Sequence, residues 1–369
     1  MKALIAMSGG VDSSVAALLA MRMGYECVGV TMKLFTNEDA NESDDRPCCS
    51  LSGAADAARV CNKLGISHYV FDFADDFRED VIERFVRSYE RGETPNPCID
   101  CNTFLKFGKL LDRAIDMGFD KVVTGHYAAI REEDGRYLLV RAADKNKDQT
   151  YFLYSMTQDQ LKHIDFPLGD LTKAEVRDIA TEAGFVNAKK AESQDICFVT
   201  DGKYSDFIDT YRGDASPPGF FVDKEGRKLG EHRGITHYTI GQRKGLGIAL
   251  GHPVFVKEIC PGTNEIILSD AEDVFVDCIE ITDINWIKSK PDVEKIRTNV
   301  AIRYGAKPSP AILYPDHVLN KAVVEFNKPV RAPSKGQAAV MYENDAVVGG
   351  GRICKTDANL DRKIPENIQ

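Results

Sequence analysis

The sequence contains no apolar run long enough to cross a membrane, since a spanning helix needs about 20 consecutive apolar residues. Its first apolar run, residues 2–7, meets Ser8 too early for a secretory signal peptide. We therefore expect a cytoplasmic protein that does not bind membranes. Cysteines stay reduced in that compartment, so we interpret the ten in this chain as core residues, nucleophiles or metal ligands before disulfides.

The chain also lacks the excess of positive charge that is typical of proteins binding long nucleic acids. Its net charge is −10 at pH 7, and the acidic excess is concentrated in residues 1–200, whereas residues 276–357 are slightly basic. We expect no DNA partner. Binding to RNA stays compatible with this composition, because local basic patches suffice when salt screens distant repulsion.

A glycine-rich loop near the start lacks the lysine of kinase-type phosphate loops. The string Ser8-Gly9-Gly10-Val11-Asp12-Ser13 follows an apolar run and opens a helix. The two glycines allow a tight turn whose N–H groups face an anion, and the helix start adds its positive dipole end. Without a lysine for the γ-phosphate, the loop favours ATP cleaved to AMP and pyrophosphate. Asp12 would help to hold Mg²⁺, and Ser8 and Ser13 would add hydroxyl donors. The alternative is an ordinary strand-to-helix turn capped by Asp12 or Ser13.

Strand and helix patterns alternate through the first part of the chain. Apolar runs predict strands at 2–7, 26–32, 68–72 and 121–124, and periodic segments predict helices at 51–64, about 76–90 and 103–117. This alternation predicts an α/β fold with a doubly wound parallel sheet that binds ligands at the carboxyl ends of its strands. Asp134-Gly135 indicates a hairpin, and Thr172 with Glu175 indicates a capping box.

The pattern changes near residue 217 to short alternating segments separated by turns, which predicts two small β-rich domains. We expect four parts. These are a pyrophosphate-loop ATP-binding and catalytic domain at 1–205, a central β domain at 206–275, a barrel-like C-terminal domain at 276–357 and a flexible tail at 358–369.

Three cysteines lie in polar, loop-like settings. Cys98 and Cys101 lie in the segment from Thr94 to Asn102, whose two prolines we expect to keep it out of a helix and near the surface, beside the helix expected from 103. A thiolate at a helix N-terminus is stabilised. Cys197 follows almost a hundred residues later. We interpret Cys27, Cys61, Cys260 and Cys278 as core residues, while the role of Cys48 and Cys49 stays ambiguous.

A Cys-x-x-Cys pair alone indicates a redox dithiol, half a zinc site or coincidence. Zinc would need a second pair at comparable spacing, and the chain has none. A thioredoxin-like role would want the pair at the end of the first strand, where the phosphate loop stands instead. ATP cleavage combined with reactive thiols suggests thiolation, in which ATP adenylates an oxygen and sulfur displaces AMP.

An ordered set of motifs gives this chain a resemblance over residues 1 to about 355. The set comprises Ser8-Gly-Gly-Val-Asp-Ser13, Thr94-Pro-Asn-Pro-x-x-x-Cys101-Asn102, Lys106-Phe-Gly108, Thr124-Gly-His-Tyr-Ala128, Lys147-Asp-Gln-Thr-Tyr-Phe152, Glu192-Ser-Gln-Asp-Ile-Cys-Phe198 and Thr239-Ile-Gly-Gln-Arg-Lys-Gly-Leu-Gly247. The chain resembles the tRNA-specific 2-thiouridylases. The resemblance implies an ATP-dependent sulfurtransferase that places sulfur on carbon 2 of the wobble uridine in tRNAs for Lys, Glu and Gln.

The resemblance also implies roles for individual residues. The ATP-binding positions match Ala6, Met7, Ser8, Gly9, Gly10, Val11, Asp12, Ser13, Met32 and Gly125. Cys197 matches the cysteine that carries the incoming persulfide, and Cys101 the nucleophile paired with it. The positions that line the target base match Asn96, Pro97 and Cys98, and the tRNA-contacting positions match His126, Lys147, Asp148, Gln149, Arg303, Tyr304 and Gln337, with Arg303, Tyr304 and Gln337 in the C-terminal domain. Asp148 or Thr150 as a helix cap, and Arg303 as a solvated charge, are the simpler alternatives.

One position departs from the family pattern. Many members carry Asp where this chain has Cys98, and that carboxylate is suggested to act as an acid or base. With Cys98, Cys101 and Cys197, three thiolates would be available to hold a 4Fe-4S cluster with one open iron, as an alternative to persulfide relay. The sulfur donor would be a persulfide carrier protein or free sulfide. Competing functions are another pyrophosphate-loop synthetase or ligase, and a non-enzymatic nucleotide-sensing or RNA-binding protein.

Overall fold

The computed structural model describes residues 1–35, 51–190, 196–199, 203–289 and 292–356. Five strands in its N-terminal part form one parallel sheet in the order β3-β2-β1-β4-β7. They are β1 (Lys2–Ala6), β2 (Glu26–Lys33), β3 (His68–Asp72), β4 (Lys121–Val123) and β7 (Ile164–Asp165). The central strand β1 ends directly before the glycine loop, so the loop lies at the carboxyl edge of the sheet.

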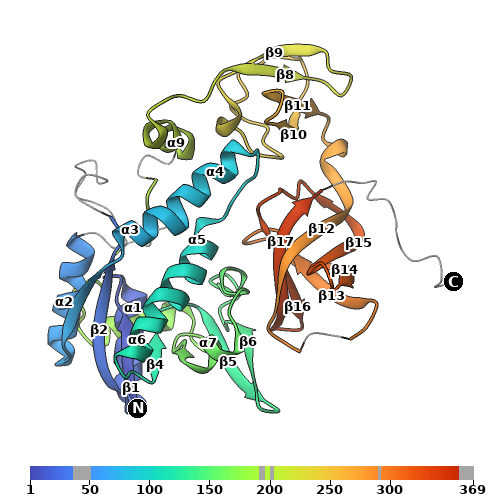
Figure 1. Ribbon diagram of the computed structural model, residues 1–369. Helices are drawn as coiled ribbons and strands as arrows, with labels where there is room; N and C mark the ends of the chain where they lie inside the picture. Colours follow the sequence, from blue (N-terminus) through green and yellow to red (C-terminus); the bar gives the residue numbers. More distant parts are fainter. Residues whose placement is uncertain (36–50, 191–195, 200–202, 290–291, 357–369) are drawn as a thin grey trace.

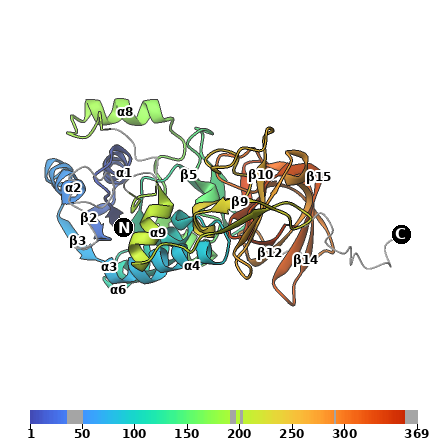
Figure 2. The same ribbon diagram turned by 90° about the horizontal axis from the view of Figure 1, so that it is seen from above.

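Helices cover both faces of this sheet (Figures 1 and 2). One face carries α1 (Val11–Arg22), α2 (Leu51–Leu64) and α8 (Lys173–Glu182), and the other carries α3 (Ala74–Phe77), η1 (Arg78–Glu83), α4 (Arg84–Glu90) and α6 (Leu110–Asp116). Ala3 and Ile5 pack with α1, whereas Leu4 between them packs with Phe77. Successive side chains of a strand point to opposite faces, so β1 is buried on both sides. The predicted doubly wound fold is confirmed.

The helix that carries two of the cysteines begins earlier than the sequence suggests. α5 (Pro97–Asp100), the π-helical η2 (Cys101–Lys109) and α6 follow one another without a break. The prediction that the prolines keep this segment out of a helix is wrong. Pro97 occupies the first helical position, where its fixed φ suits a helix and its missing N–H is not needed, and the Asn96 side chain accepts a hydrogen bond from the Cys98 N–H (3.2 Å).

A hairpin of the N-terminal part joins the C-terminal sheet. β5 (Ala128–Glu133) and β6 (Arg136–Arg141) are connected by Asp134 and Gly135, both at positive φ, as the Asp-Gly pair predicts. Val140 then pairs with Ala346 of the C-terminal part. The sequence pattern did not predict this connection.

The C-terminal strands close a barrel in the order β12-β15-β14-β13-β16-β17, with β17 pairing back to β12. They are β12 (Phe275–Trp286), β13 (Ile296–Ala301), β14 (Ser309–Asp316), β15 (Lys321–Arg331), β16 (Ala338–Glu343) and β17 (Ala346–Lys355). Ile281, Leu313 and Met341 are buried in its core. The predicted barrel-like architecture is confirmed, while the exact domain boundaries stay a prediction.

A smaller sheet lies between the two larger parts in sequence. Its order is β10-β11-β8-β9, with strands β8 (Gly219–Val222), β9 (Lys228–His232), β10 (Phe255–Cys260) and β11 (Glu265–Ser269). Figure 1 shows it at the far end of α4, beside α9 (Tyr204–Arg212). Both β-rich units therefore flank the helical layer formed by α4 and α5.

The remaining elements are α7 (Gln158–Lys162) and the short 3₁₀ turns η3 (Thr150–Phe152), η4 (Ile235–His237) and η5 (Glu272–Val274). The capping box is confirmed, because Thr172 and Glu175 exchange hydrogen bonds at the start of α8. Among the helices of the described ranges, none combines the length and hydropathy needed to cross a membrane. The predictions on Cys48, Cys49 and the tail at 358–369 lie outside the described residues.

Candidate nucleotide and thiol site

The glycine loop is folded around its own hydroxyl groups. The Ser8 N–H donates to Ser13 Oγ (3.2 Å), and the Ser13 and Ser14 hydroxyls donate to the Gly10 carbonyl (3.1 and 2.9 Å). Gly10 is the N-cap of α1 and has no side chain to bond the N–H groups that follow it, while its own N–H donates to Ser8 Oγ (3.3 Å). Uncapped N–H groups at a helix start are suited to an anion such as phosphate. The fold therefore places the predicted phosphate loop in a geometry that suits the prediction.

Close packing behind the loop requires glycine. Gly9 has φ +76°, and a Cβ there would lie 2.2 Å from the Gly53 carbonyl oxygen in α2. Asn187, which the sequence analysis missed, donates from Nδ2 to the Gly9 carbonyl (3.0 Å) and to Ser14 Oγ (2.9 Å). This amide is buried, and its Oδ1 has no hydrogen-bond partner within the described ranges. The loop is thus held by α2 on one side and by Asn187 on the other.

Asp12 is engaged by two side chains that the motif did not reveal. Lys173 Nζ contacts both carboxylate oxygens of Asp12 (2.7 and 2.9 Å), and the Tyr127 hydroxyl donates to Oδ1 (2.8 Å). Lys173 is buried and comes from the first turn of α8, 161 positions away in sequence. The expected Mg²⁺-binding carboxylate is therefore an ion-paired one in this structure. The loop sequence lacks a lysine, and the fold supplies one.

The segment from Thr124 to Tyr127 connects the loop to the cysteine-bearing helix. A Cβ on Gly125 would lie 2.7 Å from backbone atoms of Asp12 and Ser13, so this segment touches the start of α1. The next residue, His126, packs its ring 5.7 Å from Phe107 of η2 and bonds Thr124 Oγ1 through Nδ1 (2.6 Å). Burial, reinforced by Lys106, holds the pKa of His126 well below its usual range. The imidazole is neutral at pH 7.

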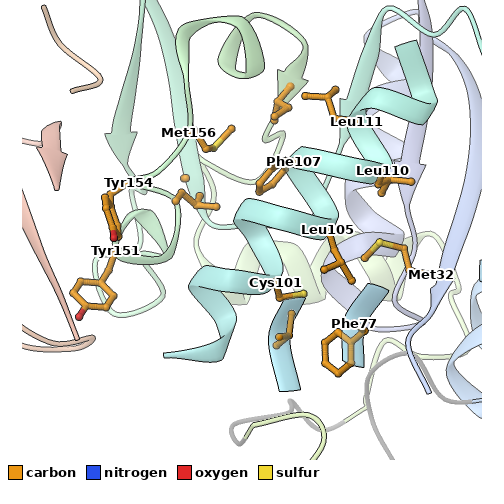
Figure 3. Close-up of a cluster of buried hydrophobic side chains, with 14 of the residues drawn as sticks. Met32, Phe77, Cys101, Leu105, Phe107, Leu110, Leu111, Tyr151, Tyr154 and Met156 are labelled. Atoms are coloured by element: carbon orange, nitrogen blue, oxygen red, sulfur yellow. The ribbon is translucent and has the colours of Figure 1, made fainter. Parts of the chain in front are cut away.

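The other predicted nucleotide residue outside the loop, Met32, has its side chain in the core. It is buried near the end of β2, in the same cluster as Leu105 and Phe77. Figure 3 shows these three side chains close to Cys101. A role of Met32 toward ATP would therefore depend on its main chain.

Cys98 and Cys101 lie on one helix but in different surroundings. Cys98 is exposed, whereas the Cys101 residue is only 8% exposed and belongs to the hydrophobic cluster of the helical layer. The π-helical turn that begins at Cys101 brings Gly108 close to the Thr103 carbonyl, where a Cβ would lie at 2.9 Å. Such π-helical turns are frequent at functional sites.

Cys197 packs against the same hydrophobic cluster as Cys101. Its neighbour Phe198 is buried in an aromatic group, with ring centroids 5.2 Å from Phe85 and 5.0 Å from Phe207. Phe198 therefore anchors the described residues 196–199 against α4 and α9. Both cysteines, 96 positions apart in sequence, thus contact the same large hydrophobic cluster, which extends from Leu4 to Val347.

The structure does not support a three-cysteine cluster site. Within the described ranges, no group of three or more His, Cys, Asp or Glu side chains is arranged to hold a metal. Cys98 is solvent-facing while Cys101 is buried, so the two thiols do not share one environment. The described residues therefore give no support to the 4Fe-4S cluster, which was the alternative to persulfide relay.

The C-terminal barrel holds the loop that precedes the cysteines. Gln337 Nε2 donates to the Thr94 carbonyl (2.8 Å), and the Thr94 N–H donates to the Lys335 carbonyl (2.7 Å). A Cβ on Gly336 would lie 3.0 Å from Glu93 Cβ. Gln337, predicted to contact tRNA, is therefore also a residue that positions the Thr94–Pro97 loop.

Three neighbouring predicted tRNA contacts differ in how strongly the protein already engages them. Asp148 is buried and accepts hydrogen bonds from Arg141 Nε (2.9 Å) and the Thr150 hydroxyl (2.9 Å). Gln149 Oε1 accepts from the Tyr127 N–H (2.9 Å). Lys147 is half-buried in the turn before them. The intramolecular bonds favour a structural role for Asp148, although the N-cap of the turn that follows is Gln149 and not Asp148.

Arg303 and Tyr304 lie on an exposed loop of the barrel and line a cavity of about 280 Å³. Lys307 gives its lining further positive charge, while Arg141 and Lys145 also line it but are paired with Asp148 and Asp345 (2.9 Å each). The Tyr304 ring lies 4.2 Å from the Phe152 ring and is 44% exposed. A basic groove with an exposed aromatic ring is suited to a single-stranded nucleic acid.

Three family models match consecutive parts of the chain. The tRNA methyl transferase HUP domain matches residues 1–201, the tRNA methyl transferase PRC-barrel domain residues 205–270, and the aminomethyltransferase β-barrel domain residues 276–353. Among solved structures, a U34-tRNA thiolase from Methanococcus maripaludis covers 57% of this chain and 66% of its own, with 16% identity and a TM-score of 0.34. A likeness this distant supports no argument about the site.

Curated relatives match nearly the whole chain. The tRNA-specific 2-thiouridylase MnmA of Clostridium beijerinckii is 48% identical over 353 residues, which are 95% of this chain and 98% of the relative. The protein of the same name from Clostridioides difficile is 47% identical over 96% of this chain and 98% of its own. The ordered motifs, the fold and these full-length matches agree. The chain belongs to the family of the tRNA-specific 2-thiouridylases.

Proposed function

We propose that this protein is an ATP-dependent tRNA sulfurtransferase that converts the wobble uridine of tRNAs for Lys, Glu and Gln to 2-thiouridine. The observation that carries the proposal is the Thr124–Tyr127 segment. It contacts the phosphate loop through Gly125 and Tyr127, and the cysteine-bearing helix through His126. Nucleotide chemistry and thiol chemistry would therefore take place at the two ends of one site.

In the first step the loop would bind ATP, with Mg²⁺ on its phosphates. The carbon-2 oxygen of uridine attacks the α-phosphorus, the bond to the β-phosphate oxygen breaks, pyrophosphate leaves, and N3 loses its proton. Lys173 and Asp12 lie where the charge of the phosphates would act on them, because the Lys173 ammonium is within 2.9 Å of the Asp12 carboxylate in the loop. We expect ATP to draw Lys173 toward the phosphates and leave Asp12 for the metal.

In the second step the outer sulfur of a Cys197 persulfide would form a bond to carbon 2, and AMP leaves with the former oxygen. The Cys101 thiolate then attacks the Cys197 sulfur. The bond between that sulfur and the transferred atom breaks, 2-thiouridine is released and takes up a proton, and a Cys101–Cys197 disulfide remains. An external thiol reductant restores both cysteines. Cys101 belongs to the hydrophobic cluster of the helical layer, and Cys197 packs against that cluster.

The partners follow from this scheme. The protein would bind tRNA and, in the cytoplasm, a persulfide carrier protein that passes its outer sulfur to Cys197. Free sulfide would be the donor only in the alternative with a 4Fe-4S cluster. The target base would enter beside Asn96, Pro97 and Cys98, after leaving the anticodon stack. The RNA around the target base would be contacted by Arg303, Tyr304, Lys147, His126 and Gln337.

The role of Arg303 can be tested separately. Arg303→Ala should weaken tRNA binding and lower the salt dependence by about one counterion for each phosphate that is no longer bound. Binding measured at several salt concentrations reports both properties. Unchanged binding at all of them would assign Arg303 to the solvated surface.

The test of the proposed function is whether AMP and pyrophosphate release depends on tRNA. The proposal predicts release with unmodified tRNA and little without it, accompanied by 2-thiouridine in the digested product. A small-molecule ligase would release both products with no RNA present. A nucleotide sensor or a simple RNA-binding protein would release neither, and either result would overturn the proposal.

A further inference from the structure

We propose that the cavity between α4 and the C-terminal barrel binds a backbone phosphate of the RNA next to the target nucleotide. The cavity measures about 490 Å³ and is lined by Arg84, Arg87, Arg91, Arg352 and Asn96, among others. None of these arginines belongs to the phosphate loop, the thiol pair or the predicted tRNA contacts. The inference rests on the proposed function, because its ligand is the tRNA.

The arginines meet there because of helical spacing. Arg84 and Arg87 lie three positions apart on α4, and Arg91, four positions further, is the C-cap, so the three follow one side of the helix. Arg352 comes from β17 of the barrel and lines the same cavity. Two separate elements therefore place guanidinium groups in the same cavity. A guanidinium group can bind phosphate oxygens with two parallel N–H donors.

Two of the four arginines keep most of their donor capacity. Arg87 and Arg91 are held at hydrogen-bond distance by Glu83 (2.6 Å) and Glu93 (3.1 Å). Arg84 meets Asp100 only at 3.9 Å, and Arg352 meets Glu93 and Asp283 at 3.6 Å. Contacts that long are not hydrogen bonds. The Arg84 guanidinium is also oriented by the Phe104 ring, whose centroid is 4.5 Å away.

The location of the cavity favours RNA backbone over other anions. Pro95 and Asn96 form part of its wall, and Asn96 caps the helix that carries Cys98 and Cys101. A base inserted beside Asn96 would leave its flanking phosphates within reach of this wall. Free pyrophosphate would be expected at the glycine loop instead. The lining arginines, four in number, exceed the three acidic residues Glu93, Asp100 and Asp283 that also line the cavity.

The test compares tRNA binding by the full chain over a range of salt concentrations. The double variant Arg84→Gln/Arg352→Gln should bind unmodified tRNA at least about tenfold more weakly at low salt. Its slope of log K against log salt should fall by about 0.7 for each single-strand phosphate that the variant no longer binds. Arg113→Gln is the matched control, because the Arg113 guanidinium also lies on a phenylalanine ring, Phe71 at 3.9 Å, but does not line the cavity. This control should bind as wild type does.

Several results would overturn the inference. The inference is wrong if the double variant has the circular dichroism of the wild type and an unchanged salt slope. In that case the proposed function stays intact, provided that the wild-type protein binds tRNA. Equal loss of affinity for pyrophosphate alone would show a free-anion site. Normal tRNA binding with impaired sulfur delivery from a persulfide protein would indicate a protein-docking surface. Arg84→Lys separates charge from shape, and we expect it to bind between wild type and Arg84→Gln. If wild type binds no tRNA, both proposals fail together.

Discussion

Two helices begin at the candidate site, and their N-termini are built in opposite ways. α1 starts after Gly10, which has no capping side chain, so the N–H groups that follow Gly10 are available to an anion. α5 starts with Pro97, which has no N–H, and the Asn96 side chain accepts from the next N–H that could have bound one. The first end is suited to phosphate and the second is closed to it. Under the proposed function, the start of α1 would bind the nucleotide and the start of α5 would present the thiols.

The largest effect that separates the two ends is expected from the cysteines. Cys101→Ser and Cys197→Ser should each abolish 2-thiouridine formation, because a hydroxyl cannot carry or displace the transferred sulfur. Mass spectrometry of digested tRNA measures this. Cys27→Ser and Cys278→Ser serve as controls and should lower thermal stability more than activity. Sulfur transfer retained by Cys197→Ser would remove that residue from the mechanism.

The phosphate end should respond to its acidic and basic pair. Asp12→Ala and Lys173→Gln should each lower tRNA-dependent pyrophosphate release at least about tenfold, roughly 1.4 kcal/mol in the barrier, and leave tRNA affinity unchanged. Stopped assays of pyrophosphate and separate binding measurements distinguish the two properties. Arg177→Gln, also on α8, is a control on the same helix. Pyrophosphate release by Asp12→Ala within about threefold of wild type would contradict the role of Asp12.

A third contrast concerns the acidic residues near the two helix starts. Asp12 has an ammonium partner at 2.7 Å, whereas Asp100 has only a long contact to Arg84, and burial raises the pKa of Asp100 to about 6. The folded state therefore holds a proton that the unfolded state releases between about pH 4 and pH 6. Wild-type stability is lost as pH rises through that window.

Asp100→Asn removes this cost. The variant should have the same melting temperature as wild type below about pH 4 and a higher melting temperature above about pH 6. The corresponding gain in the free energy of unfolding should not exceed about 3 kcal/mol. Thermal melts from about pH 3.5 to about pH 8 measure the difference. A pH-independent offset between the two proteins would mean that Asp100 does not titrate in that window.

The smallest expected effect tests the cap itself. Asn96→Ala should destabilise the protein by about 1 kcal/mol, because the Cys98 N–H loses its side-chain acceptor. Thermal unfolding reports this value, and Asn146→Ala in an exposed turn is the control. We also expect a measurable loss of thiolation at unchanged ATP binding. A variant as stable as wild type would show that the cap is not needed at this end.

The sequence predicted the local parts of the site and missed the distant ones. The phosphate loop, the Asp-Gly hairpin and the Thr172–Glu175 capping box depend on neighbouring residues, and their patterns are visible in a short window. Lys173 reaches Asp12 across 161 positions, and no periodicity reports such a contact. The helix start at Pro97 was missed because proline was interpreted as a breaker, although the first helical position favours it. The strand pairing of Val140 with Ala346 likewise depends on the packed barrel.

The most direct test is whether the two chemistries separate in Cys197→Ser. Single-turnover reactions with labelled ATP and unmodified tRNA would measure pyrophosphate, AMP and 2-thiouridine together. If nucleotide and thiol chemistry take place at two ends of one site, the variant releases pyrophosphate in a tRNA-dependent burst and forms no 2-thiouridine. Release of pyrophosphate without tRNA, or no release at all from a folded variant that still binds ATP and tRNA, would contradict this view of the site.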